Sequence, residues 1–554
     1  RHRALILVSG TATVAVLAGL VTALWQTHEA RTQARRADAV QRFLVATFAA
    51  NNPEIANGRK LSAREALDIG AKRIESEFGN VPETLTQVDA TVADLYAEMG
   101  EPAAAQPHND RAIAVLEQLG KSDTEQYLER LFRRQEILVE LARWPEALRA
   151  VEVAMDAVSR HPTARDRWLP ALQTAMGWVH LRLSHHDLAI QFSEAAVTSE
   201  RARNAGNSPQ LLRSLSSLAV VYSQTGQLSK ALRQHEEALA ISASTPGVDK
   251  IDLLIRKGNV AQLANRLGDF ERAEQLFSES VPELMRHAGP SHVRTVTQRG
   301  LRALNLAELG RFDEAIAEQR SNVAAAEASM SASDENLLLA RAQLARILYA
   351  GERPEEAYPL IAAASSAFDS KHPKPTLLRE AARWILAEVQ AARGQIDVGA
   401  ANLATALAAW RQLIGSTKHT GLYRAELALA VLQRFADPGG AAARASRACT
   451  DLRAAGEEGV RFVARCEVIA AWLHLLAEGD PTQWTPKFTA ARDAALKTLP
   501  ATHPLRAEWL AAEAEWLARA PSTRARSAEL LDSAQALYLQ ATGRALPKPL
   551  VRFH

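Results

Sequence analysis

The sequence predicts an all-α protein, an α-solenoid of helical hairpins preceded by one transmembrane helix. Three observations support this prediction: a helix-favouring composition, an uncharged stretch near the N-terminus, and a repeat of 42 residues. Ala, Leu, Arg and Glu dominate the chain, and these residues lose little conformational freedom in a helix. Because 47% of the residues are hydrophobic, the disordered and collagen-like classes are excluded.

The charge balance argues against nucleic acid as a partner. Lys and Arg together number 65, and Asp and Glu 63, which leaves a formal net charge of +2. A chain without an overall positive field is a poor ligand for a polyanion. We therefore expect no nucleic-acid binding.

Residues 4–25 are expected to cross a membrane, within a first domain of residues 1–25. These 22 residues carry no charge, and as a helix they would reach about 33 Å, the thickness of the hydrocarbon core of a bilayer. A cleaved signal peptide, whose apolar part is shorter, and a buried core helix are the alternatives. Positive side chains flank the stretch on both sides, so they do not decide its orientation.

Two helical segments are expected between the membrane span and the repeats. Residues 26–50 lack Gly and Pro and predict a juxtamembrane helix, whose small and apolar residues permit a coiled-coil homodimer as well as a solitary helix. Residues 51–80 form a separate helical segment that leads into the repeats, with an N-cap signature from Ser62 to Glu65. The first residue is Arg and not an initiator Met, so we expect an upstream part of the gene product to be missing.

A register of 42 residues defines the repeats. Short breaks between apolar helical patterns recur at Gly100, Ala142, Ser184, Gly226, Gly268, Gly310, Glu352 and Gly394. Five positions after each break stands a small residue: Ala105, Ala147, Ala189, Ala231, Ala273, Ala315 and Ala357, with the eighth displaced to Ala400. A second small residue, seven positions before most breaks, lets the two backbones of a hairpin approach closely. We therefore expect clear repeats over residues 81–415.

Beyond residue 415 the register weakens. Adding 42 to Gly394 gives Ala436 and then Glu478, in segments that still show a helix, a break and a helix. We expect residues 416–542 to form degenerate repeats, the last of them a cap, because a terminal repeat exposes one face to water. The tail of residues 543–554 contains two prolines and is expected to be irregular.

The fourth and neighbouring repeats resemble a known family. Two facing apolar stripes meet at small residues on either side of the break, and an aromatic residue follows the break by two positions at Trp144, Phe270 and Phe312. The pattern resembles the tetratricopeptide repeat, with a longer period than usual. The resemblance implies a concave groove for a protein or peptide ligand, in which Asn, Lys and Arg bind carboxylates. The candidate groove residues are Arg213, Asn259, Gln262 and Arg266, and a solvated polar stripe is the alternative.

No enzyme motif is found in the sequence. It lacks GxxxxGK(S/T), HExxH and GxSxG, and it lacks the HRD and DFG triplets of protein kinases. We therefore assign no catalytic residue and no cofactor to this chain. His185, His186 and Asp187, with His180 nearby, are the most ligand-like cluster, but they lack the spacing and the fourth ligand of a zinc site. No metal site is expected.

The stretch from Trp25 to Phe78 carries a second resemblance, through its ARRADAVQRFL and LSAREALDIGAKRIE helices. It is similar to the segment that joins a membrane span to tetratricopeptide repeats in bacterial transmembrane serine/threonine protein kinases. The resemblance implies an upstream kinase domain that uses ATP and Mg, a single-pass protein of the inner membrane, and periplasmic repeats that sense or bind a partner. The alternatives are a membrane-anchored transcription regulator with external repeats and a non-catalytic scaffold.

The two cysteines are candidates for a disulfide. Cys449 and Cys466 lie at equal distances on either side of a turn expected around Gly456 and Gly459, so they should face each other across two antiparallel helices. An oxidising periplasm would allow the bond. The alternative is a pair of free cysteines in a helical core, which are common.

Overall fold

The computed structural model describes residues 41, 43, 45, 62–203, 208–415, 419–478, 481–501, 503–518, 521–543 and 545–546, without the side chains of 162–164, 478, 481 and 482. The expected membrane span at residues 4–25 lies outside these ranges, as do most of the juxtamembrane helix with its coiled-coil seam and most of the tail of residues 543–554. Within the described ranges, no helix has the length and apolar character that crossing a bilayer requires.

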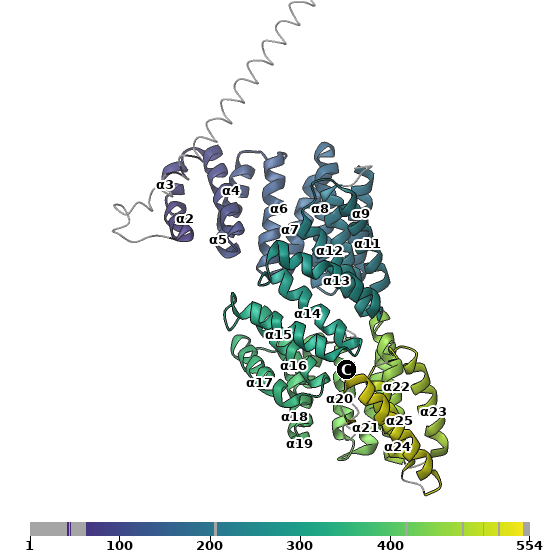
Figure 1. Cartoon of the computed structure of the whole chain (residues 1–554). Helices are drawn as coiled ribbons and strands as arrows, with labels where there is room; N and C mark the ends of the chain where they lie inside the picture. The colour runs from purple at the N-terminus through teal and green to yellow at the C-terminus, as the bar shows by residue number, and fades with distance from the viewer. Residues whose placement is uncertain are drawn as a thin grey trace, which may run out of the picture. The chain divides into compact units, whose positions relative to one another are not determined.

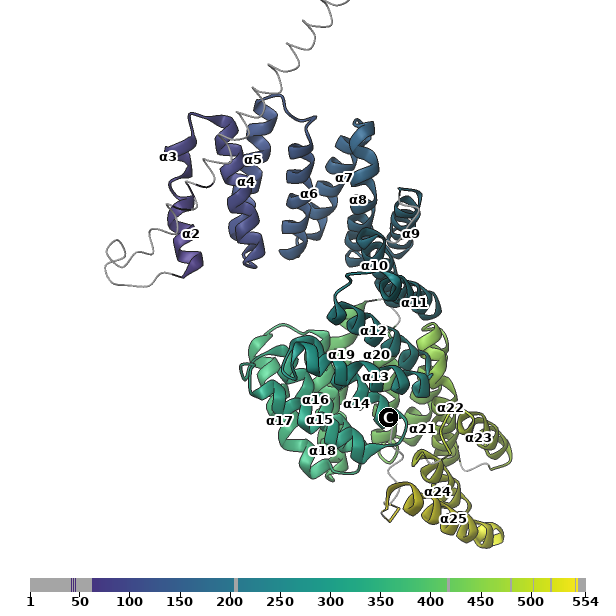
Figure 2. The same cartoon turned by 45° about the horizontal axis from the view of Figure 1, so that its top comes forward.

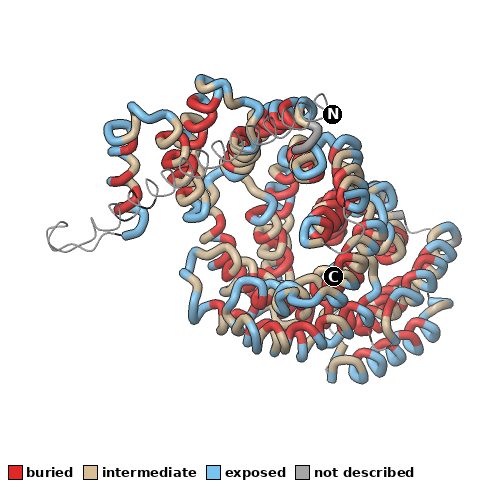
Figure 3. Tube along the Cα trace, turned by 90° about the horizontal axis from the view of Figure 1, so that it is seen from above, coloured by how far each residue is buried: buried red, intermediate tan, exposed pale blue. Residues whose placement is uncertain are grey.

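The chain divides into two compact units, an N-terminal unit of residues 1–221 and a C-terminal unit of residues 222–554. The described residues of both units form successive antiparallel helices and contain no strand (Figure 1). Figure 3 shows the buried residues along the faces where neighbouring helices meet. The prediction of an all-α solenoid of helical hairpins is confirmed for these residues.

The N-terminal unit begins with two short helices. The capping box at Ser62 is confirmed, because its hydroxyl accepts the Glu65 N–H at 3.2 Å and the Glu65 carboxylate accepts the Ser62 N–H at 2.9 Å. The helices of this unit are α2 (Ala63–Ala71), α3 (Ile74–Phe78), α4 (Pro82–Glu98), α5 (Pro102–Gln118), α6 (Glu125–Glu140), α7 (Trp144–Ser159), α8 (Pro162–Arg182), α9 (His186–Arg203) and most of α10 (Pro209–Gln224).

The C-terminal unit continues the alternation of first and second helices. Its helices are α11 (Leu228–Ser244), α12 (Lys250–Leu267), α13 (Phe270–Ala288), α14 (Val293–Glu308), α15 (Phe312–Glu327), α16 (Glu335–Ala350), α17 (Pro354–Lys371), α18 (Leu377–Ala392), α19 (Ile396–Ile414), α20 (Thr420–Gln433), α21 (Pro438–Arg453), α22 (Glu457–Glu478), α23 (Pro481–Leu496), α24 (Leu505–Leu517) and α25 (Arg524–Thr542), with a short 3₁₀ helix at Pro521–Thr523.

The turn register is confirmed by the backbone. All eight turn positions have a positive φ, between 54° at Ala142 and 89° at Gly268 and Gly394. Three of the turn residues are not glycine. Among the described residues, the only non-glycine residues with a positive φ are these three: Ala142, Ser184 and Glu352. A side chain strains such a backbone, so the surrounding hairpin must hold these turns in place.

The small residues lie where two backbones approach. The seven predicted alanines five positions after the turns are fully buried, each with 0% exposure. The eighth position was wrong: Gly399 keeps the register, and Ala400 lies one residue beyond it. A Cβ added to Gly399 would lie 2.5 Å from the carbonyl oxygen of Ala387, its partner on α18, so the backbone itself requires glycine there.

The degenerate repeats remain helical hairpins through α25. Ala436 lies in the break between α20 and α21, as predicted, whereas Glu478, also expected in a break, is the last residue of α22. Cys449 on α21 and Cys466 on α22 form a disulfide, with their Cα atoms 5.5 Å apart. The expected turn was partly wrong, because Gly456 lies in it with φ 83° whereas Gly459 belongs to the first turn of α22.

Six even-numbered helices of the C-terminal unit, α12 to α22, form a closed inner layer, which we call the inner ring. α12 packs on α14, the packing continues through α16, α18, α20 and α22, and α22 packs back on α12. The contact between α12 and α22 joins helices that are far apart in the sequence, and Figure 2 shows both helices in the C-terminal unit. The odd-numbered helices α13 to α21 pack mainly on their neighbours in the sequence and cover the inner ring, whereas α25 packs on α24.

Candidate functional site

The four groove residues predicted from the sequence do not share one unit. Arg213 is exposed on α10 in the N-terminal unit, whereas Asn259, Gln262 and Arg266 are on α12 in the C-terminal unit. Gln262 is exposed, and the other two are half-buried. The ligand role of all four stays a prediction.

Arg266 is engaged by its own chain. Its guanidinium group donates two hydrogen bonds to the carboxylate of Glu458, at 3.1 and 2.7 Å, and one to the hydroxyl of Ser223. Burial alone would raise the pKa of Glu458, but these hydrogen bonds from Arg266 hold that pKa below its usual value. The carboxylate that the sequence led us to expect from a ligand is therefore supplied by the start of α22.

The start of α22 also satisfies the ends of two other helices. We call residues 456–465 the clasp. The carboxylate of Glu457 accepts the N–H of Ser229 at 2.5 Å, in the first turn of α11, where the N-cap residue makes no side-chain hydrogen bond. Arg461 donates to the carbonyl of Asn265 in the last turn of α12. The clasp thus caps helices about 200 residues earlier in the chain and closes the inner ring.

Glu308 is the buried anion at this closure. It lies between Arg461 and Arg465 of α22, at 3.2 and 3.3 Å. Burial alone would raise the pKa of Glu308, but the two guanidinium groups hold it well below its usual range. Burial, with Arg465 nearby, lowers the pKa of His503 to about 3, so this imidazole is neutral. At the closed edge, the guanidinium groups of Arg461 and Arg465 thus share one buried carboxylate.

Farther along the inner ring the charges are not balanced. Arg346 on α16 and Arg424 on α20, which we call the arginine pair, flank Glu388 on α18, yet no carboxylate among the described residues lies within ion-pair distance of either guanidinium group. Arg424 contacts aromatic rings instead, 4.2 Å from the centroid of Phe462 and 5.8 Å from that of Trp384. Both arginines are half-buried.

The carboxyl group between the arginine pair does not neutralise it. Glu388 is 7% exposed, and burial raises its pKa to about 7 although Arg346 and Arg424 oppose the shift. Burial and the neighbouring Arg346 lower the pKa of Arg424 to about 9, which leaves it charged at neutral pH. The charge of Glu308 opposes this shift but forms no ion pair with Arg424. The arginine pair therefore carries an excess of positive charge whose natural complement is a carboxylate or another anion.

Three of these residues, Glu308, Arg346 and Glu388, lie one to three repeats beyond the groove residues predicted on α12. Gln262, Arg346 and Glu388 occupy the same repeat position, six residues before a turn, and Arg266 and Glu308 share another, two residues before a turn. The signal that would have found them is a change in side-chain charge at those positions from one repeat to another.

The histidine cluster of the sequence analysis is a packing cluster. The Nδ1 atoms of His180 and His185 lie 3.2 Å apart, and the ring of His180 stacks on Phe192 with centroids 5.4 Å apart. Burial lowers the pKa of His180, and the neighbouring His185 lowers it further. Across the described ranges, no group of three or more His, Cys, Asp or Glu side chains is placed to hold a metal ion.

Comparison with known proteins gives a family match and structural similarities. The tetratricopeptide repeat model matches residues 168–244 and 210–286. The chain is similar to the quorum sensor NprR from B. thuringiensis in its apo form, with 16% identity, coverage of 68% of this chain and 99% of that one, and a TM-score of 0.47. It is also similar to a Rap protein complexed with Competence and Sporulation Factor, with 12% identity, coverage of 76% of this chain and 98% of that one, and a TM-score of 0.41. A tetratricopeptide repeat protein from Parabacteroides merdae is similar with 15% identity, coverage of 51% and 92%, and a TM-score of 0.37.

A search of curated protein sequences finds no match. The family match lies within α8 to α13, the helices in which the predicted turns and buried alanines recur at their 42-residue spacing. The chain thus contains tetratricopeptide repeats within an all-helical solenoid.

Proposed function

We propose that the C-terminal unit binds an acidic segment of a partner protein through the arginine pair. The observation that supports this proposal is the absence, among the described residues, of an ion-pair partner for Arg346 and Arg424 on a layer where Glu308 and Arg266 are fully paired. Carboxylates of a peptide would supply charge-assisted hydrogen bonds to both guanidinium groups. On this proposal, the C-terminal unit is a non-catalytic module that binds a partner protein.

The test compares two labelled peptides on the full chain. A short fluorescein-labelled peptide rich in Glu is expected to bind, and the same peptide with Gln in place of Glu is expected to bind far more weakly. Arg346→Gln and Arg424→Gln should each weaken binding of the Glu peptide by about tenfold or more, the worth of a hydrogen bond to a charged group. Arg447→Gln, an exposed arginine on the outer helix α21, is the matched control and should have no effect.

Two results would contradict the proposal. Equal affinity for the two peptides would mean that carboxylates are not recognised. Unchanged affinity in both arginine variants would place the binding site elsewhere, and the same assay on Asn259→Ala and Gln262→Ala would then test the groove predicted on α12.

We further propose that this module is the external sensor region of a membrane-anchored signalling protein. The resemblance of residues 25–78 to transmembrane serine/threonine kinases supports a parent kinase with ATP and Mg in an upstream domain, an inner-membrane span and periplasmic repeats. The disulfide supports an oxidising compartment. Protease treatment of intact spheroplasts should degrade the repeats, and protection of the repeats would favour a cytoplasmic location. The sequence upstream of Arg1 distinguishes a kinase from a transcription regulator or a scaffold.

A further inference from the structure

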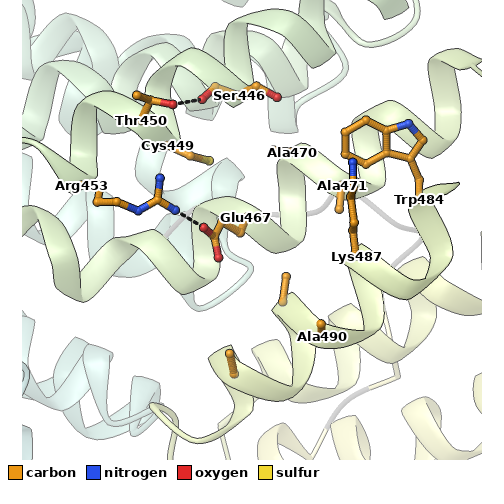
Figure 4. A pocket seen from close by; sticks show the side chains of 12 residues that line it. Ser446, Cys449, Thr450, Arg453, Glu467, Ala470, Ala471, Trp484, Lys487 and Ala490 are labelled. Carbon is orange, nitrogen blue, oxygen red and sulfur yellow. Dashed lines mark hydrogen bonds and ion pairs between the residues drawn. The ribbon is translucent and has the colours of Figure 1, made fainter.

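A surface pocket lies beside the disulfide. It has a volume of about 470 Å³ and is formed by α21, α22 and α23 (Figure 4). This volume lies within the range of small-molecule sites, roughly 300 to 1,000 Å³. Much of its wall is formed by small apolar residues that leave the space free: Ala470, Ala471, Ala490, Ala491 and Ala494.

The two cysteines of the disulfide differ in their position relative to this pocket. Cys449 is one of the lining residues and is 5% exposed, whereas Cys466 does not line the pocket and has no exposure. The Sγ of Cys466 faces the carbonyl of Ala445 inside the α21–α22 hairpin, at 3.9 Å. A molecule in the pocket would therefore meet Cys449 and not Cys466.

The rim of the pocket carries positive charge. The Nζ of Lys487 lies 3.9 Å from the ring centroid of Trp484, and no carboxylate among the described residues pairs with it. Arg453 is paired with Glu467 across the pocket, as Figure 4 shows. An exposed, unpaired lysine attracts anions, including the thiolate form of a thiol.

We propose that this pocket admits a small anionic thiol that attacks the disulfide at Cys449. The thiolate sulfur forms a new bond to the Sγ of Cys449, and the Cys449–Cys466 bond breaks. Its electron pair passes to the Sγ of Cys466, which then takes a proton from water. The products are a mixed disulfide on Cys449 and a buried thiol at Cys466, and the exchange requires no other oxidant or reductant. The covalent tie between α21 and α22 is lost, and α22 carries the clasp.

The experiment uses the native full chain and two thiols of different charge. The protein is incubated with 3-mercaptopropionate or with cysteamine, quenched with an alkylating agent, and mapped by peptide mass spectrometry. We expect the adduct on Cys449 and the alkylated thiol on Cys466. Ala490→Phe and Ala494→Phe, at exposed positions of the lining, should each slow both reactions by about tenfold or more because access limits exchange.

Charge is tested separately from access. Lys487→Gln should slow the reaction of 3-mercaptopropionate by about threefold and that of cysteamine less, because an exposed charge contributes modestly. Arg447→Gln lies outside the lining and should leave all rates unchanged. Three results would each overturn the proposal. They are an adduct on Cys466, a reaction that occurs only in denaturant, and reaction rates that are unchanged in both phenylalanine variants.

Discussion

Two regions of the inner ring contain the same residue types in different arrangements: the closed edge, where α22 meets α12, and the side that carries the arginine pair, which we call the open side. At the closed edge, Glu308 lies between two arginines and Arg266 binds Glu458, so each buried or half-buried charge has a partner. On the open side, Arg346 and Arg424 flank a carboxyl group that is only partly ionised at neutral pH. The difference indicates that paired charges hold the ring together, whereas the unpaired charges are the ones that we propose bind a ligand.

The largest effect is expected at the closed edge, from Glu308→Gln. The change leaves Arg461 and Arg465 without their carboxylate in a poorly hydrated place, which should cost about 3 to 5 kcal/mol of unfolding free energy. Chemical denaturation of the full chain measures it through the transition of the C-terminal unit. Glu314→Gln, which breaks an exposed pair with Arg311, is the control and should cost about 1 kcal/mol or less. Equal costs for the two variants would mean that the closure is not a buried ion cluster.

An effect of opposite sign is expected on the open side, from Glu388→Gln. The folded state raises the pKa of Glu388 from 4.5 to about 7, so folding favours the protonated carboxyl group. The ionised group destabilises the fold progressively as the pH rises from about 4.5 to about 7, and fully above that. The variant should therefore gain stability at pH 8, by up to about 3 kcal/mol, and should gain almost nothing at pH 4.5. Denaturation midpoints at the two pH values test this, and a loss at pH 8 would show that Glu388 serves as an anion.

The smallest effect is expected at the rim of the closure, from Glu458→Gln. Its pair with Arg266 is 28% exposed on both sides, so its contribution should be about 1 kcal/mol or less and should fall as salt screens it. Hydrogen exchange in the first turn of α22 should be faster in the variant at low salt and should match the wild type at high salt. A difference that persists at high salt would show that the clasp is held by more than charge.

The part of the fold that was predictable from the sequence is the part that repeats. Turn positions and buried alanines recur every 42 residues because each hairpin needs the same close approach, and this local requirement places even Ala142, Ser184 and Glu352 in the register. Gly399 was missed because an alanine stood beside it. The equal spacing of Cys449 and Cys466 about one turn likewise reflects a single hairpin.

The closure of the inner ring was not predictable in this way. Glu458 and Arg266 are 192 residues apart, and their contact depends on the curvature that accumulates over many hairpins. No periodic signal encodes such a contact. The arginine pair was missed for a related reason, since charged residues at a repeat position become a site only when neighbouring helices bring them together.

Closure changes how the C-terminal unit can vary and fold. An open solenoid is stabilised by nearest neighbours, so hairpins can be added or removed with little effect on the rest. Here the first and last helices of the inner ring touch, so deleting one hairpin between α12 and α22 would move the clasp away from the helix ends that it caps. The number of repeats in this unit is therefore fixed by geometry. The contacts that close the ring join distant parts of the chain, which makes them the slowest to form and couples the ring into one cooperative unit.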